Sequence, residues 1–79
     1  MTLDIDLHGY TVLDAKRILE RFIASAPKDC TKIIVIHGYS RGDAIKTMIQ
    51  NPNELRSNRI KSRKYSLNQG ETILELYTK

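Results

Sequence analysis

The stretch KIIVIHGY, residues 32–39, is a run of β-branched residues that ends in histidine, glycine and tyrosine. Such continuous runs are typical of a buried central strand. The same ending recurs as LHGY at residues 7–10, after a segment whose apolar and acidic residues alternate as in a strand with one covered face. These two stretches contain both histidines of the chain, His8 and His37. We therefore expect two strands that end in similar glycine turns.

A helical pattern separates these two strands. Thr11 is a suitable N-cap, apolar residues then recur at helical spacing, and Pro27 ends the helix. Strand, helix and strand in this order predict a right-handed crossover between parallel strands. A shorter helix is expected from Asp43, as its N-cap, to about Gln50.

Two further strands are expected at residues 59–67 and 71–77, joined by Asn68-Gln69-Gly70 as an antiparallel hairpin. Two helices can cover one face of a four-stranded sheet, but not both faces. We therefore predict an α/β two-layer sandwich of order β-α-β-α-β-β with a mixed four-stranded sheet. Residues 1–79 are expected to form a single domain, whose open sheet face or edge is polar and partly basic.

Composition limits the class of protein. Of the 79 residues, 41% are hydrophobic and 28% are charged, which suits a soluble globular domain. No apolar run approaches the roughly 20 residues that a membrane span needs, and the first residues are acidic rather than basic and apolar as in a leader. One cysteine excludes an internal disulfide and a cysteine-rich zinc site. We therefore expect a cytoplasmic protein.

The positive charge lies in the second half of the chain. Residues 41–79 contain eight basic and four acidic residues, which accounts for the net charge of +4, and RSNRIKSRK at 56–64 contains no acidic residue. A basic block indicates an acidic polymer as partner, RNA or DNA, although a solvated surface strand has the same composition. The candidate phosphate-binding residues of this strand are Arg59, Lys61 and Arg63. Alternation predicts that they share one face with Tyr65.

His8 and His37 each follow a strand, at the edge where α/β sheets commonly bind ligands. If the two strands are neighbours, about 4.8 Å apart, both imidazoles can reach one phosphate. Histidine titrates near neutrality and can act as a general base or acid, and Asp6 shares a face with His8 and can orient its ring. On RNA, such a base activates the 2′-hydroxyl to attack the adjacent phosphate. Alternatively, the glycines permit turns and the histidines only satisfy backbone groups.

The loop after His37 offers further groups for nucleic-acid binding through backbone amides, an aromatic ring and a cation. These candidate residues are Gly38, Tyr39, Ser40, Arg41 and Gly42. Two histidines and an aspartate make three ligands for a metal ion, so a divalent metal stays open. However, no close-spaced ligand signature is present, and the pattern requires no cofactor.

Together these motifs resemble the Smr (small MutS-related) domain family. Its hallmarks are a Leu-Asp-x-His-Gly segment, a His-Gly-x-Gly loop and a closing glycine-threonine strand. IDLHG at 5–9 is similar to the first, IHGY at 36–39 to the start of the second, and GET at 70–72 to the third. Ser40 stands where the loop motif has its last glycine, and a glycine follows only at Gly42.

The resemblance implies the two-layer fold and an endonuclease or nucleic-acid-binding role, associated with nicking DNA or cutting mRNA on ribosomes. By position, Asp6 and His8 correspond to the segment tied to activity, and His37 and Gly38 to the loop that contacts nucleic acid. The leading hypothesis is an endonuclease that cleaves RNA, or nicks DNA, by acid–base catalysis through Asp6, His8 and His37. The alternatives are a non-catalytic module that binds RNA or the ribosome, and a domain whose partner is another protein.

Overall fold

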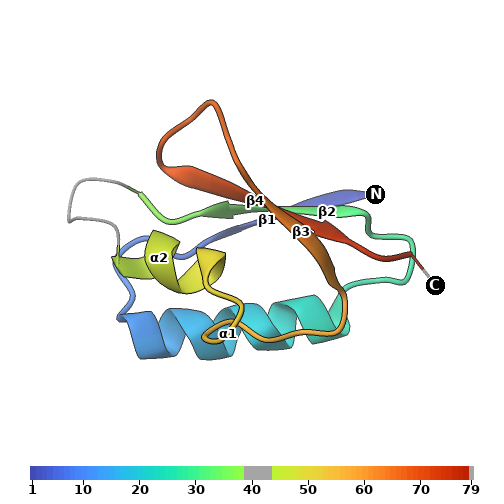
Figure 1. Cartoon of the computed structure of the whole chain (residues 1–79), viewed down its shortest axis with the longest axis horizontal. Coiled ribbons are helices and arrows are strands. Elements are labelled where there is room, and N and C mark those ends of the chain that lie inside the picture. The colour runs from blue at the N-terminus through green and yellow to red at the C-terminus, as the bar shows by residue number, and fades with distance from the viewer. Residues whose placement is uncertain (39–43, 79) are drawn as a thin grey trace.

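The computed structural model describes residues 1–38 and 44–78. Its elements are β1 (Thr2–Asp6), α1 (Val12–Ser25), β2 (Lys32–Ile36), α2 (Ala44–Gln50), β3 (Ile60–Tyr65) and β4 (Glu71–Leu76). The strands form one sheet in the order β1-β2-β4-β3, with β1 parallel to β2 and the other two pairs antiparallel. Both helices lie on the same side of the sheet (Figure 1). The predicted α/β two-layer sandwich with a mixed four-stranded sheet is therefore confirmed.

The first helix begins and ends close to its predicted bounds. The Thr11 hydroxyl accepts the backbone N–H of Asp14 at 3.1 Å, which satisfies one of the free amides of the first turn. Ala15, Leu19 and Ile23 recur every four residues and are fully buried, so one stripe of α1 packs in the core. Neither helix of the described ranges is long and apolar enough to cross a membrane.

The register of the sheet shows which side chains lie on the face without helices. Asp4 pairs with Ile34, Ile34 with Ile73, and Ile73 with Lys64, so these four form one row across the sheet. The two isoleucines in the middle are only half-buried, and both charged residues at the ends are exposed. Another row of this face pairs Lys32 with Glu75. The open face is therefore apolar in its centre and polar around it, with basic side chains on β2 and β3, which agrees with the prediction of a polar, partly basic face.

Arg59 lies at the end of α1. Its guanidinium donates hydrogen bonds to the carbonyl oxygens of Ile23 at 2.7 Å, Ala26 at 2.6 Å and Pro27 at 2.9 Å. The last carbonyls of a helix have no partner within the helix, and a cation there also interacts favourably with the helix dipole. Arg59 therefore joins the start of β3 to the end of α1.

Arg63 has the same role at the second helix. Its guanidinium donates to the carbonyl oxygens of Ile49 at 2.9 Å and Leu55 at 2.6 Å, on the helix side of the sheet. The prediction that Arg59, Lys61, Arg63 and Tyr65 share one face is therefore correct only for Arg63 and Tyr65, which both lie on the helix side. Simple alternation fails because the pairing of β3 with β4 shifts at Lys61, where β3 has one extra residue.

We expect Arg59→Met to lower the free energy of unfolding by about 2 kcal/mol, because three carbonyl groups lose a charged donor. The measurement is urea denaturation followed by circular dichroism. Lys61→Met is the matched control, because Lys61 belongs to the same basic segment and is exposed. Equal stability of the two variants would show that the Arg59 hydrogen bonds do not stabilise the fold.

Candidate active site at the ends of β1 and β2

Asp6, the last residue of β1, and His8 form a hydrogen-bonded pair at the surface. The Nδ1 atom of His8 lies 2.5 Å from Oδ1 of Asp6, and the same oxygen accepts the backbone N–H of His8 at 3.0 Å. These side-chain and backbone hydrogen bonds lower the pKa of the Asp6 carboxyl, which is therefore ionised at neutral pH. An ionised carboxylate only accepts hydrogen bonds, so Nδ1 carries a proton.

This arrangement leaves the other nitrogen of the His8 ring as a proton acceptor whenever the ring is neutral. Nε2 of His8 has no hydrogen-bond partner among the described residues. The side chain of His8 is 69% exposed and that of Asp6 is 50% exposed, so a substrate can reach both. The pair has the chemistry of an oriented general base.

The two glycine turns lie side by side, as expected for neighbouring parallel strands. The backbone N–H of Leu7 donates to the carbonyl of Ile36 at 2.7 Å, which continues the parallel pairing beyond β1. Gly9 has a φ of 86° and Gly38 a φ of 74°, in the left-handed region that favours glycine. A Cβ atom on Gly38 would lie 3.4 Å from the Cβ of His8, an ordinary van der Waals distance, so the two turns are close neighbours and only the φ favours glycine.

His37 occupies a different environment, because its side chain is buried and 7% exposed. Nδ1 lies 2.8 Å from the carbonyl oxygen of Gly38, and Nε2 lies 2.9 Å from the hydroxyl oxygen of Thr72. Since a carbonyl only accepts, Nδ1 donates, and the Nε2 of a neutral ring accepts the Thr72 hydroxyl. The structure therefore does not bring the two imidazoles to one ligand.

The backbone after β2 has partners at the start of β4. The N–H groups of His37 and Gly38 both donate to the carbonyl of Gly70, at 2.8 and 3.0 Å. Together with Thr72, this carbonyl fixes the turn that approaches His8. A catalytic role of His37 stays a prediction, and its contacts favour a role in positioning Gly38.

A shallow depression of about 410 Å³ lies at the pair and is lined by Asp6, His8, Gly9 and Tyr10. Tyr10 is half-exposed. Its ring offers an aromatic surface next to the His8 imidazole, and bases of single-stranded nucleic acids commonly stack on such rings. The depression thus combines a proton acceptor with a surface that can bind a base.

The other predicted site residues lie away from this depression or outside the described residues. Tyr39, Ser40, Arg41 and Gly42, and also the predicted N-cap Asp43, lie outside the described residues. Arg59 and Arg63 are bound to carbonyl groups at the ends of the helices, whereas Lys61 is exposed. Among residues 1–38 and 44–78, no three His, Cys, Asp or Glu side chains are arranged to hold a metal ion.

The Smr domain family model matches residues 5–73 of this sequence, which includes both histidines and the start of β4. The chain belongs to the Smr domain family. Its structure is similar to the crystal structure of the Smr domain of Thermus thermophilus MutS2, with a TM-score of 0.78 and 22% sequence identity, over 92% of this chain and 95% of that chain. At this identity the likeness establishes the fold alone. A comparison with curated proteins gave no match.

In this Smr domain the three family motifs meet at one end of the sheet. The segment with Asp6 and His8 lies beside Gly38 of the second motif, and the second motif is held by Gly70 and Thr72 of the third. The resemblance alone singled out Gly70 and Thr72 in the sequence. No spacing or periodicity indicated that a threonine of the last strand pairs with His37.

We expect the pKa of Asp6 to rise toward its ordinary value in the His8→Ala variant, because the side-chain hydrogen bond is the largest cause of its lowering. Carboxyl ¹³C chemical shifts recorded against pH measure this change. A pKa that is lower in the folded chain stabilises the fold above the ordinary aspartate pKa, and this contribution is lost as the pH falls through the lowered value. An unchanged Asp6 titration in the variant would contradict the pairing.

We expect Thr72→Val to destabilise the fold by about 1 to 3 kcal/mol, because the buried Nε2 of His37 loses its partner. Thr72→Ser keeps the hydroxyl and should retain the hydrogen bond. Urea denaturation gives the stability, and ¹⁵N chemical shifts of the imidazole report the state of His37 in both variants. If valine and serine at this position have the same effect on the ring, the hydroxyl does not bind His37.

Proposed function

We propose that this Smr domain is an endonuclease that cleaves RNA by acid–base catalysis at the Asp6–His8 pair. The observation that carries the proposal is an exposed histidine whose ring is oriented by a carboxylate through Nδ1, with Nε2 directed to no described protein group. Family membership supports it, since Smr domains are associated with nuclease and nucleic-acid-binding roles.

In the proposed reaction, Nε2 of His8 takes the proton of a ribose 2′-hydroxyl. The 2′-oxygen then forms a bond to the adjacent phosphorus, and the bond from phosphorus to the 5′-oxygen breaks. The leaving 5′-oxygen takes a proton from solvent, which leaves a 2′,3′-cyclic phosphate and a 5′-hydroxyl end. Asp6 keeps the His8 ring in one orientation and places a negative charge beside the ring as it becomes cationic.

The charge distribution supports nucleic acid as the partner. The net charge is +4, and the excess of basic residues lies in residues 41–79. Lys61 is exposed on β3 and is available to phosphates, and the loop residues Ser40 and Arg41 remain candidates by sequence. DNA nicking, ribosome association and a divalent metal remain parts of the hypothesis that the reaction products can test.

A non-catalytic RNA- or ribosome-binding module is the second candidate. It is favoured by the environment of His37, whose two ring nitrogens have protein partners. His8 is then the single histidine that faces the depression. Such a module would bind RNA through the same surface and leave it intact.

We expect His8→Ala to slow RNA cleavage by about 10²- to 10⁴-fold without a matching loss of RNA binding, because it removes the general base. Asp6→Asn should also slow cleavage, whereas Asp4→Asn, which changes an exposed carboxylate of the same strand, should not. The measurement is single-turnover cleavage of end-labelled RNA, with and without EDTA.

The ends of the products distinguish the mechanisms. A 2′,3′-cyclic phosphate agrees with attack by the 2′-hydroxyl, whereas a 5′-phosphate indicates attack by water. Cleavage of DNA would also indicate attack by water, because DNA has no 2′-hydroxyl. Cleavage by His8→Ala at the parent rate would contradict the assignment of the base. RNA binding without cleavage by the parent protein would establish the binding module instead.

A further inference from the structure

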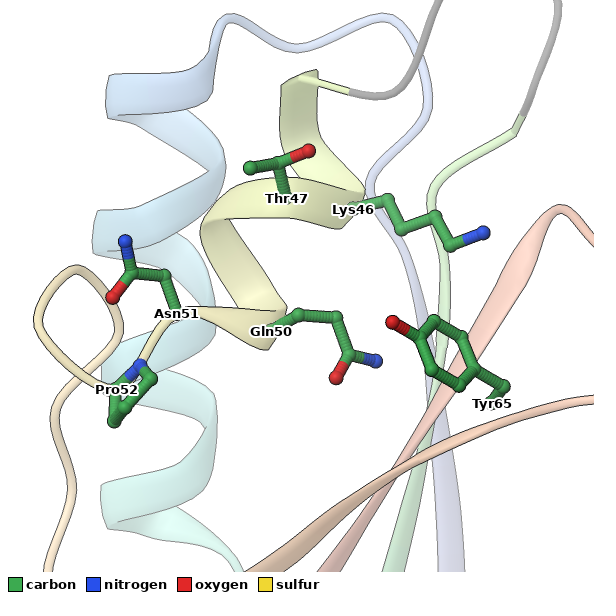
Figure 2. A pocket seen from close by; sticks show the side chains of 6 residues that line it. All are labelled: Lys46, Thr47, Gln50, Asn51, Pro52 and Tyr65. Carbon is green, nitrogen blue, oxygen red and sulfur yellow. The ribbon is translucent and has the colours of Figure 1, made fainter.

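A groove separate from the Asp6–His8 depression lies between α2 and the end of β3 (Figure 2). It has a volume of about 490 Å³ and is lined by Lys46, Thr47, Gln50, Asn51, Pro52 and Tyr65. Four of the six lining residues have polar or charged side chains, although more of the lining surface is apolar than polar. No step of the proposed reaction uses these residues.

One wall of the groove is an exposed aromatic ring. Tyr65, the last residue of β3, is 70% exposed, which is unusual for a side chain on the helix side of a sheet. The ammonium group of Lys46 lies 5.2 Å from the centre of the Tyr65 ring. This cation lies over the ring, where it interacts with the π-system and occupies one face, so a base has the other face to stack on.

The opposite wall contains a buried amide without a partner. Nε2 of Gln50 is inaccessible to solvent and makes no hydrogen bond with any described residue. Gln50 and Lys46 extend from α2 toward Tyr65 (Figure 2). Buried polar groups in native proteins nearly always have a partner. Because Nε2 is covered, a ligand with a hydrogen-bond acceptor satisfies this amide only when the Gln50 side chain turns into the groove.

We propose that this groove binds one nucleobase of a single-stranded nucleic acid. The base stacks on the ring of Tyr65, the Gln50 side chain turns so that its amide donates a hydrogen bond to the edge of the base, and the adjoining phosphate pairs with Lys46. A nucleotide supplies the π-face, the acceptor and the negative charge that these residues require. An acidic peptide would satisfy the lysine but would leave the ring without a stacking partner.

The groove and the Asp6–His8 pair lie toward the same end of the sheet. Tyr65 pairs with Thr72, Thr72 with Val35, and Val35 with Ile5, which precedes Asp6. Three strand spacings of about 4.8 Å place the backbone of Tyr65 roughly 14 Å from that of Ile5. Tyr65 lies on the helix side of the sheet, whereas Asp6, one residue after Ile5, lies on the opposite face. A strand of several nucleotides that passes around this end of the sheet can reach both sites, so the groove holds a base outside the cleaved bond. This last step rests on the proposed function, whereas base binding does not.

The experiment measures the affinity of the full chain for a fluorescein-labelled single-stranded oligouridylate by fluorescence anisotropy. Tyr65→Ala should weaken binding by about 5- to 150-fold, the range found when one stacking partner is lost. Tyr65→Phe keeps the ring and should retain the affinity. Tyr77→Ala is the matched control, because Tyr77 is another exposed tyrosine and follows the opposite end of β4.

A second measurement tests the groove without relying on affinity. The side-chain amide resonances of Gln50 should shift on addition of the oligouridylate, and the shift should be absent in Tyr65→Ala. Because Tyr65 is largely exposed, thermal unfolding of the alanine variant should match that of the parent, which separates a binding defect from a folding defect.

The outcomes separate this proposal from the proposed cleavage. Unchanged binding by Tyr65→Ala would overturn the groove proposal even if the parent protein cleaves RNA. Tyr65-dependent binding without cleavage would support the groove and contradict the nuclease. Binding of a polyglutamate peptide through Tyr65, with no binding of the oligouridylate at low salt, would assign the groove to an acidic protein partner and overturn the proposal.

Discussion

The parallel pairing of β1 with β2 is the constraint on which both the fold and the candidate site depend. Two adjacent parallel strands need a crossover, and α1 provides it on the one face where its buried stripe can pack. The same pairing continues from Leu7 to Ile36 and brings the two glycine turns together. Without this register, His8 would not lie beside Gly38, and the surface pair would have no second turn next to it.

Most of the fold could be predicted because it follows from local periodicity. The alternation in residues 3–7, the β-branched run at 32–36 and the helical spacing after Thr11 each indicate one type of element. Elements of these types in this order have few compact arrangements. The residues of the Asp6–His8 pair were also predictable, because residues two positions apart along an extended segment have their side chains on the same face. The structure adds that Asp6 and His8 are hydrogen-bonded.

The basic strand shows where reasoning from the pattern fails. The sequence indicates a charged face, but Arg59 and Arg63 satisfy carbonyl groups at the ends of α1 and α2. Long arginine side chains can turn away from the face that alternation predicts, and one extra residue at Lys61 changes the alternation itself. Both effects depend on where the helices end in space. A tertiary contact of this kind has no signal in the spacing of charges.

The two HGY segments differ for the same reason. β1 ends at Asp6, and its register with β2 places the buried Leu7 opposite His37, so His8 lies one position further along, where it is exposed. β2 lies between β1 and β4, so the residue that follows it contacts β4 and is buried, as His37 is. The register of β1 against β2, together with the position of β4, therefore separates the exposed histidine from the buried one. Because identical tripeptides have different neighbours, the repeat indicates two similar turns but not two similar functions.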